Sequence, residues 1–158
     1  PGTENVPGIV GLGEACRLVR EEGASERKRI CDLRDRLERE AIEHIPDVVI
    51  NGESNHRVPG TTNMGFLGVE GETLLIRLDL EGFATSTGSA CSVGSTEPSH
   101  VLQAMDIPRE TVRGSLRFSL GWGNTEEDVS RLLKILPDAV EKIRSMAPRT
   151  YDTSMKAS

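Results

Sequence analysis

Two amphipathic helices are predicted in the N-terminal part of the chain, because apolar residues recur there at steps of three and four. The first set is Ile9, Leu12, Cys16 and Val19, and the second is Ile30, Leu33, Leu37, Ala41 and Ile45. We expect the first helix to end near Glu22-Gly23, where glycine can cap it, and the second to run from Ser25 to Pro46. Cys16 lies on the apolar side of the first helix and is predicted to be a core residue, and Cys31 is interpreted in the same way.

Four short strands are predicted further along the chain. They cover residues 48–50, which end in the turn dipeptide Asn51-Gly52, and residues 62–67, 83–86 and 115–120. The last of these alternates clearly, with Leu116, Phe118 and Leu120 on one side and Arg117 and Ser119 on the other. If the apolar side is core, Arg117 points outward or into a cleft.

Three more helices complete the pattern. One covers about residues 70–80, one has Pro98 in its first turn and carries Val101, Leu102 and Met105, and the last is expected to be capped by Asn124. Its core stripe is Leu132, Leu136, Val140 and Ile143. Helices alternating with short strands indicate an α/β or α+β fold, for which we expect a short mixed or antiparallel sheet packed against helices, the arrangement that the family resemblance described below also implies. Residues 149–158 show no periodicity and are expected to be a flexible tail.

Composition excludes several classes of function. Charged residues make up 28% of the 158 residues and the formal net charge is −6, which argues against a nucleic-acid groove. No apolar run is long enough for a membrane span, so a cytoplasmic protein is expected. The three cysteines form no C-x-x-C pair, which favours a reducing compartment, and His44, His56 and His100 lack the spacing of metal ligands. We therefore expect no metal site.

Three residues are candidates for chemistry. Cys91 lies in a run of small residues between a predicted strand and a predicted helix, where a thiol can be exposed and nucleophilic; a plain loop cysteine is the alternative. Arg117 is either a solvated strand residue or an anion-binding guanidinium suited to a carboxylate. Thr3 is interpreted first as a helix cap and second as a phosphate ligand.

Several motifs together resemble the cysteine desulfurases of the iron–sulfur cluster assembly and nitrogen-fixation type. Residues 2–9 read GTENVPGI, residues 88–91 read GSAC, residues 95–101 read STEPSHV, and residues 116–121 and 125–127 read LRFSLG and TEE. The resemblance runs from Gly2 to about Pro148 and corresponds to the C-terminal part of that family. It implies a class V aminotransferase of fold type I, with residues 1–24 as a connecting helix and residues 25–148 as the small domain.

The resemblance also implies an activity, which is conversion of L-cysteine to L-alanine with pyridoxal 5'-phosphate. Cys91, in a mobile loop at 87–97, matches the cysteine that carries the sulfur as a persulfide to an acceptor such as an iron–sulfur scaffold protein. Arg117 matches the anchor for the substrate carboxylate. Thr3 matches the threonine that reaches the cofactor phosphate of the partner subunit, which implies a homodimer.

One departure from the family limits these implications. The Schiff-base lysine of the family has no counterpart here, because none of Lys28, Lys134, Lys142 and Lys156 matches its motif. We expect the chain to be a fragment or half of a split enzyme that is inactive in isolation. Two alternatives stay open, namely a noncatalytic persulfide-carrier domain and another fold-type-I enzyme such as a selenocysteine lyase or another class V aminotransferase.

Overall fold

A computed structural model describes residues 2–53, 56–88 and 99–146 of the chain. The elements follow in the order α1 (Val6–His44), β1 (Val48–Ile50), β2 (Thr61–Phe66), α2 (Gly71–Leu80), α3 (His100–Ala104), α4 (Arg109–Arg113), β3 (Ser115–Ser119) and α5 (Glu126–Met146). The strands form an antiparallel sheet in the order β1-β2-β3. The predicted α+β class with a short sheet packed against helices is therefore confirmed.

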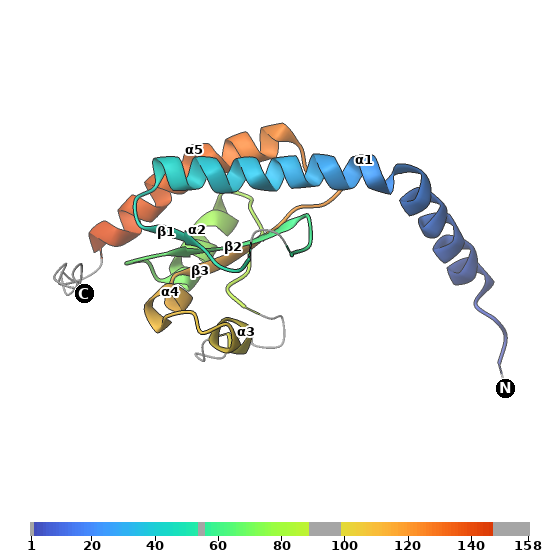
Figure 1. Cartoon of the computed structure of the whole chain (residues 1–158), viewed down its shortest axis with the longest axis horizontal. Helices are drawn as coiled ribbons and strands as arrows, with labels where there is room; N and C mark the ends of the chain where they lie inside the picture. The colour runs from blue at the N-terminus through green and yellow to red at the C-terminus, as the bar shows by residue number, and fades with distance from the viewer. Residues whose placement is uncertain (1, 54–55, 89–98, 147–158) are drawn as a thin grey trace.

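Helices cover both faces of the sheet. Figure 1 shows α1 and α5 side by side above it and α3 and α4 below it. The core lies on the α1 and α5 side, because the strand residues that face these helices are buried with residues of α2. Its fully buried large side chains include Leu33, Leu37, Met64, Phe66, Leu74, Leu78, Leu116, Leu136 and Val140. The predicted stripe of the second helix is confirmed, since all five of its residues are buried.

The prediction of two N-terminal helices is wrong, because α1 runs without interruption from Val6 to His44. Gly23 does not adopt the positive φ of a glycine cap, so the chain continues as helix. Figure 1 shows that this helix is bent. Ser25, whose hydroxyl donates to the Glu22 carbonyl oxygen at 2.8 Å, contributes a side-chain bond of the kind that bends helices.

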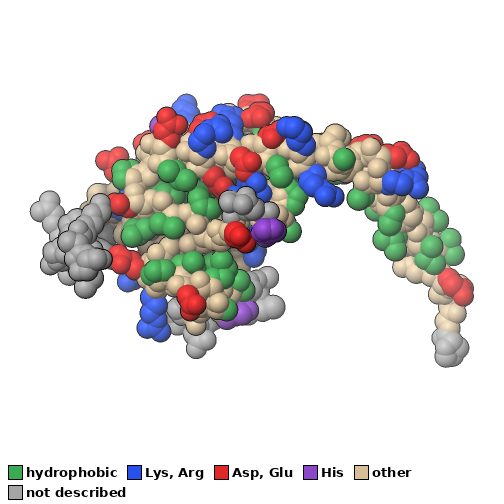
Figure 2. Space-filling view, in the orientation of Figure 1, with side chains coloured by type: hydrophobic (Ala, Val, Ile, Leu, Met, Phe, Trp, Pro, Cys, Tyr) green, Lys and Arg blue, Asp and Glu red, His purple; other side chains and the backbone are tan. Residues whose placement is uncertain are grey.

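The N-terminal part of α1 projects away from the domain (Figure 1). Its apolar side chains are therefore exposed, and they form the green surface on the projecting arm in Figure 2. They are Val6, Ile9, Val10, Leu12 and Val19, which are 58–67% exposed. Cys16 is exposed with them, so its predicted place in the core is wrong. The periodicity identified the helix correctly, but the described residues include nothing that covers this side of it.

The third predicted strand is largely absent. Of residues 83–86 only Ser86 pairs with the sheet, as a single bridge to Arg117. The reason lies at Phe83, whose N–H donates to the Leu78 carbonyl oxygen at 2.9 Å and so closes the end of α2. Residues 48–50 form β1 as predicted, and β2 and β3 each agree with the prediction to within a residue.

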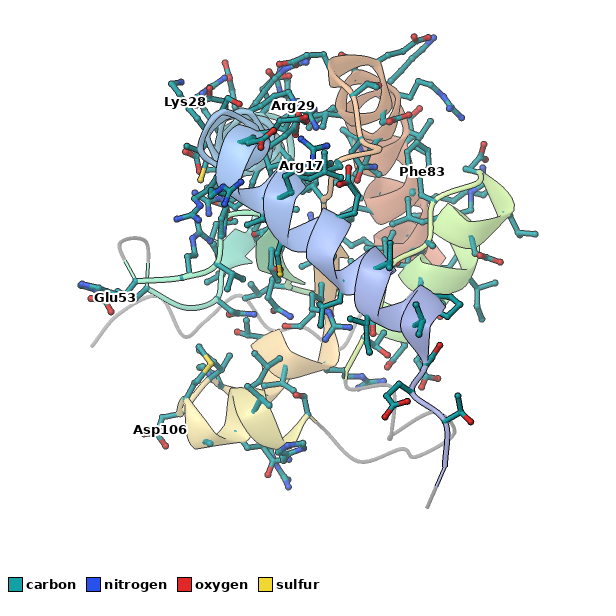
Figure 3. All side chains as sticks on the ribbon, turned by 90° about the vertical axis from the view of Figure 1, so that its right-hand side faces the viewer. Arg17, Lys28, Arg29, Glu53, Phe83 and Asp106 are labelled. Atoms are coloured by element: carbon teal, nitrogen blue, oxygen red, sulfur yellow. The ribbon has the colours of Figure 1, made fainter. Side chains whose placement is uncertain are left out.

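The start of α5 also differs from the prediction. Thr125, not Asn124, caps the helix: its hydroxyl oxygen accepts from the Asp128 N–H at 3.2 Å, and the Asp128 carboxylate accepts from the Thr125 N–H at 2.9 Å. The Asn124 side chain instead accepts from the Gly121 N–H. Arg29 of α1 donates to the carbonyl oxygen of Asn124 at 2.6 Å, which ties the two helices together (Figure 3).

Candidate functional site

Arg117 lies on the face of the sheet opposite the main core. Its neighbours in β3, Leu116 and Phe118, are buried, whereas Arg117 itself is exposed, as the alternation predicts. The prediction that Arg117 points away from the core is therefore confirmed.

Backbone hydrogen bonds fix the surroundings of Arg117. Its N–H donates to the Ser86 carbonyl oxygen at 2.7 Å and its carbonyl oxygen accepts from the Ser86 N–H at 3.2 Å. Both of its backbone groups are thus turned away from β2, where Asn63 is its cross-strand partner. In an antiparallel ladder this makes Asn63 and Arg117 a narrow, non-hydrogen-bonded pair, in which the two side chains come close together.

The segment beside Arg117 leads directly toward Cys91. Ser86 donates its hydroxyl proton to the Gly88 carbonyl oxygen at 2.7 Å, which holds a tight turn. Cys91 follows Gly88 by three positions in the sequence and lies outside the described residues, as do most of the predicted loop at 87–97 and the predicted tail. The structure therefore positions Arg117 next to the beginning of the cysteine loop.

Most arginines of this protein are neutralised by carboxylates. Arg57 makes a bidentate pair with Glu38, with both distances 2.6 Å, and Arg36 bonds Glu40 and Glu126. The Arg117 guanidinium has no such partner among the residues that the structure describes. An exposed guanidinium without an internal carboxylate is available to bind an anion from outside.

Thr3 lies before α1 and is exposed. It is not the cap of the helix as first interpreted, because the Asn5 side-chain oxygen accepts from the Gly8 N–H at 3.2 Å and takes that role. The structure shows no contact between Thr3 and Arg117, so these two candidates are not brought together within the described part of the chain.

No group of three or more metal-ligating side chains forms among the described residues. The three histidines, His44, His56 and His100, are all exposed. Nor is any helix within the described ranges long and apolar enough to cross a membrane.

A cavity of about 330 Å³ opens on the other side of Phe118. Its wall includes Phe83, which is labelled in Figure 3, together with Asn124 and Arg131. The Arg131 guanidinium lies over the Phe83 ring at 5.3 Å from the ring centre. This cavity was not predictable from the sequence, because its wall combines residues from five separated segments.

The described residues do not by themselves fit a pyridoxal phosphate. That cofactor requires a lysine amine beside the site, and Lys28, Lys134 and Lys142 are exposed on α1 and α5, away from the face that carries Arg117. Lys28 is moreover paired with Asp32 at 2.6 Å. Lys156 lies outside the described residues.

Comparison with known proteins connects this geometry to a family. The cysteine desulfurase of Nostoc sp. is 48% identical over 151 residues, 96% of this chain and 38% of the relative. The cysteine desulfurase IscS of Methanosarcina thermophila is 48% identical over 149 residues, 94% of this chain and 37% of the relative. The chain thus spans less than two fifths of the length of these relatives.

Solved structures agree with the sequence comparison. A "NIFS-like protein" matches 90% of this chain and 35% of its own, with a TM-score of 0.76 at 30% identity. A NifS-like protein from Rickettsia africae matches 89% of this chain and 36% of its own, with a TM-score of 0.74 at 28% identity. The family described as "Aminotransferase class-V" matches residues 1–132. The resemblance found in the motifs is confirmed, and the chain belongs to the aminotransferase class-V family.

Proposed function

We propose that this chain is part of a cysteine desulfurase, which converts L-cysteine to L-alanine. The names of its relatives support this proposal, and so does Arg117, which is exposed, has no ion pair among the described residues and lies beside the segment that leads into the cysteine loop. The position of Arg117 carries it, because an anchor for a substrate carboxylate must be rigid, accessible and free of internal carboxylates. Arg117 meets these requirements through its strand, its exposure and its lack of an ion pair among the described residues.

Arg117 binds the carboxylate of L-cysteine in this proposal. Its planar fork donates two N–H hydrogen bonds, one to each carboxylate oxygen, which orients the substrate. Cys91 then takes the sulfur atom: L-cysteine and the Cys91 thiol become L-alanine and a Cys91 persulfide, so that atoms balance. A run of small residues around Cys91 allows it both to reach the substrate and to deliver sulfur to an acceptor such as an iron–sulfur scaffold protein.

The remaining parts of the site are proposed to come from outside these residues. The protein uses pyridoxal 5'-phosphate, whose lysine is not among the residues of this chain, and Thr3 reaches the phosphate in the partner subunit of a homodimer. Residues 1–24 connect this segment to the cofactor domain, and residues 25–148 form the small domain. We expect the 158-residue chain alone to produce no alanine and to show no absorbance from a lysine-bound cofactor.

The experiment uses the whole protein that contains this segment, with Cys91→Ala and Arg117→Lys variants. Cys16→Ala is the matched control, because Cys16 is an exposed thiol outside the loop. Alanine release and protein-bound radioactive sulfur are measured after addition of labelled L-cysteine. We expect Cys91→Ala to lose the bound sulfur, Arg117→Lys to raise KM, and Cys16→Ala to change neither.

Two results would replace the proposal. Sulfur uptake on Cys91 from a separate persulfide donor, without alanine release from L-cysteine, would indicate a noncatalytic carrier domain. Turnover of selenocysteine that survives Cys91→Ala, with little turnover of cysteine, would indicate a selenocysteine lyase.

A further inference from the structure

We propose that Asn63 supplies a second hydrogen-bond donor for the carboxylate that Arg117 binds, and that Asn51 and Ser115 fix its amide in the donating orientation. This inference rests on the proposed role of Arg117. It assigns one binding residue, Asn63, and two positioning residues on the same face of the sheet.

The orientation starts at a backbone carbonyl group in α4. Ser115 Oγ lies 2.7 Å from the Thr111 carbonyl oxygen, which can only accept, so the single proton of the Ser115 hydroxyl is used there. Asn51 also contacts Ser115 Oγ, at 2.9 Å. Because that hydroxyl has no proton left, Asn51 must present its amide NH₂ to it.

The same amide nitrogen then determines how Asn63 is turned. Asn51 Nδ2 lies 2.7 Å from Asn63 as well as 2.9 Å from Ser115. Since Asn51 donates to both, Asn63 must face it with its carbonyl oxygen. The NH₂ group of Asn63 is consequently directed away from Asn51, and the amide cannot flip without placing two acceptors or two donors against each other.

Burial makes this orientation strict. Asn51 is 6% exposed and Ser115 is 1% exposed, so water does not replace a lost partner cheaply. The other atom of the Asn51 amide, Oδ1, is buried without a hydrogen bond in the described part of the chain. The hydrogen bonds from Asn51 to Ser115 and Asn63 are thus formed although they leave Asn51 Oδ1 without a partner. A buried acceptor without a partner is rare in folded proteins, and the fixed orientation of Asn63 explains why it is present here.

Asn63 and Arg117 form one site. They are the narrow cross-strand pair on the face opposite the core, Asn63 is half-buried, and Arg117 is exposed. The described residues offer no partner to either the Asn63 NH₂ or the Arg117 guanidinium. A carboxylate has about four lone-pair positions on two oxygens, so it can accept a bidentate guanidinium and one amide N–H together.

The kinetic test uses the whole protein with Asn63→Ala and, as matched control, Ser119→Ala, a change of a polar side chain two positions from Arg117 on β3. Loss of one hydrogen bond to a charged carboxylate raises KM for L-cysteine by about tenfold. We expect kcat to stay within about twofold, because the bond is made equally to substrate and transition state. An unchanged KM in Asn63→Ala, or an equal rise in the control, would overturn the proposal.

A second measurement does not depend on turnover. The side-chain amide signals of Asn63 in the isotope-labelled 158-residue chain are followed by NMR during titration with L-alanine and with L-alaninamide, which lacks the carboxylate. We expect a saturable shift with L-alanine alone. The inference is refuted if the Asn63 signals do not shift with L-alanine, or if they shift equally with L-alanine and L-alaninamide. If the whole protein releases no alanine from L-cysteine, the proposed function fails, and this titration still decides about the carboxylate site.

Discussion

Two leucines on α1 test whether its C-terminal part packs in the core while its N-terminal, projecting part is exposed to solvent. Leu12 is 67% exposed on the projecting part, whereas Leu37 is 1% exposed in the core. Both are interior positions of one helix, so Leu→Ala changes the helix propensity equally at each. The difference between the two variants therefore measures burial alone.

The expected magnitudes differ severalfold. Leu37→Ala removes a fully buried side chain of the core cluster, which also contains residues of the sheet and of α5, and lowers the free energy of unfolding by about 2–5 kcal/mol. Leu12→Ala changes it by less than about 0.5 kcal/mol, as for other surface substitutions. For a chain of this size a loss of about 3 kcal/mol lowers Tm by roughly 6–12 °C.

Urea unfolding followed by circular dichroism, at two protein concentrations, provides the measurement. We expect Leu37→Ala to shift the midpoint strongly and Leu12→Ala to leave it nearly unchanged at both concentrations. Equal losses in the two variants would refute the reasoning, because the arm would then be covered by other protein surface in solution.

Three further expectations concern caps, charge and the polar chain. Thr125→Ala should lower the free energy of unfolding by about 0.5–2 kcal/mol through loss of the α5 cap, and Asn124→Ala by less, as measured by urea unfolding. The hydrogen bond from Arg36 lowers the pKa of Glu40. The ion pair of these two residues therefore stabilises the fold above the ordinary pKa of a glutamate, and this stabilisation is lost as the pH falls through the lowered pKa. Arg36→Met should make the free energy of unfolding less dependent on pH below about pH 4.5, as measured by urea unfolding. Ser115→Ala should raise KM for L-cysteine by about threefold in steady-state assays, because the Asn51 amide is then free to flip.

The helical pattern was predictable only in part, and α1 shows why. The stripe from Ile30 to Ile45 and the arm from Ile9 to Val19 have the same periodicity, yet the first is buried and the second is exposed. Periodicity establishes that a helix has an apolar side, but it contains no information on which surface covers that side. The missed continuity at Gly23 has a similar cause, since glycine permits a left-handed cap without requiring one.

The part of the candidate site that depends on the alternation of side chains along a single strand was predictable from the sequence. Arg117 was placed on the correct face because its two neighbours are apolar. Asn63 was missed, since its relation to Arg117 depends on the register of β2 against β3 and on the bonds of Asn51, neither of which appears in a single segment of sequence. Ser115 was missed for the same reason.

The donor chain that begins at Thr111 has a consequence for which substitutions this protein tolerates. Its first acceptor is a main-chain carbonyl oxygen, which exists whatever side chain occupies position 111. Variation at that position therefore leaves the direction of the chain intact, provided that α4 keeps its place. Three side chains follow, those of Ser115, Asn51 and Asn63. The orientation of each one is determined by its hydrogen bond to the group before it. Homologues that preserve the site are thus expected to change Ser115, Asn51 and Asn63 only together, whereas position 111, which is 6% exposed beside Gly65, needs only a side chain of suitable size.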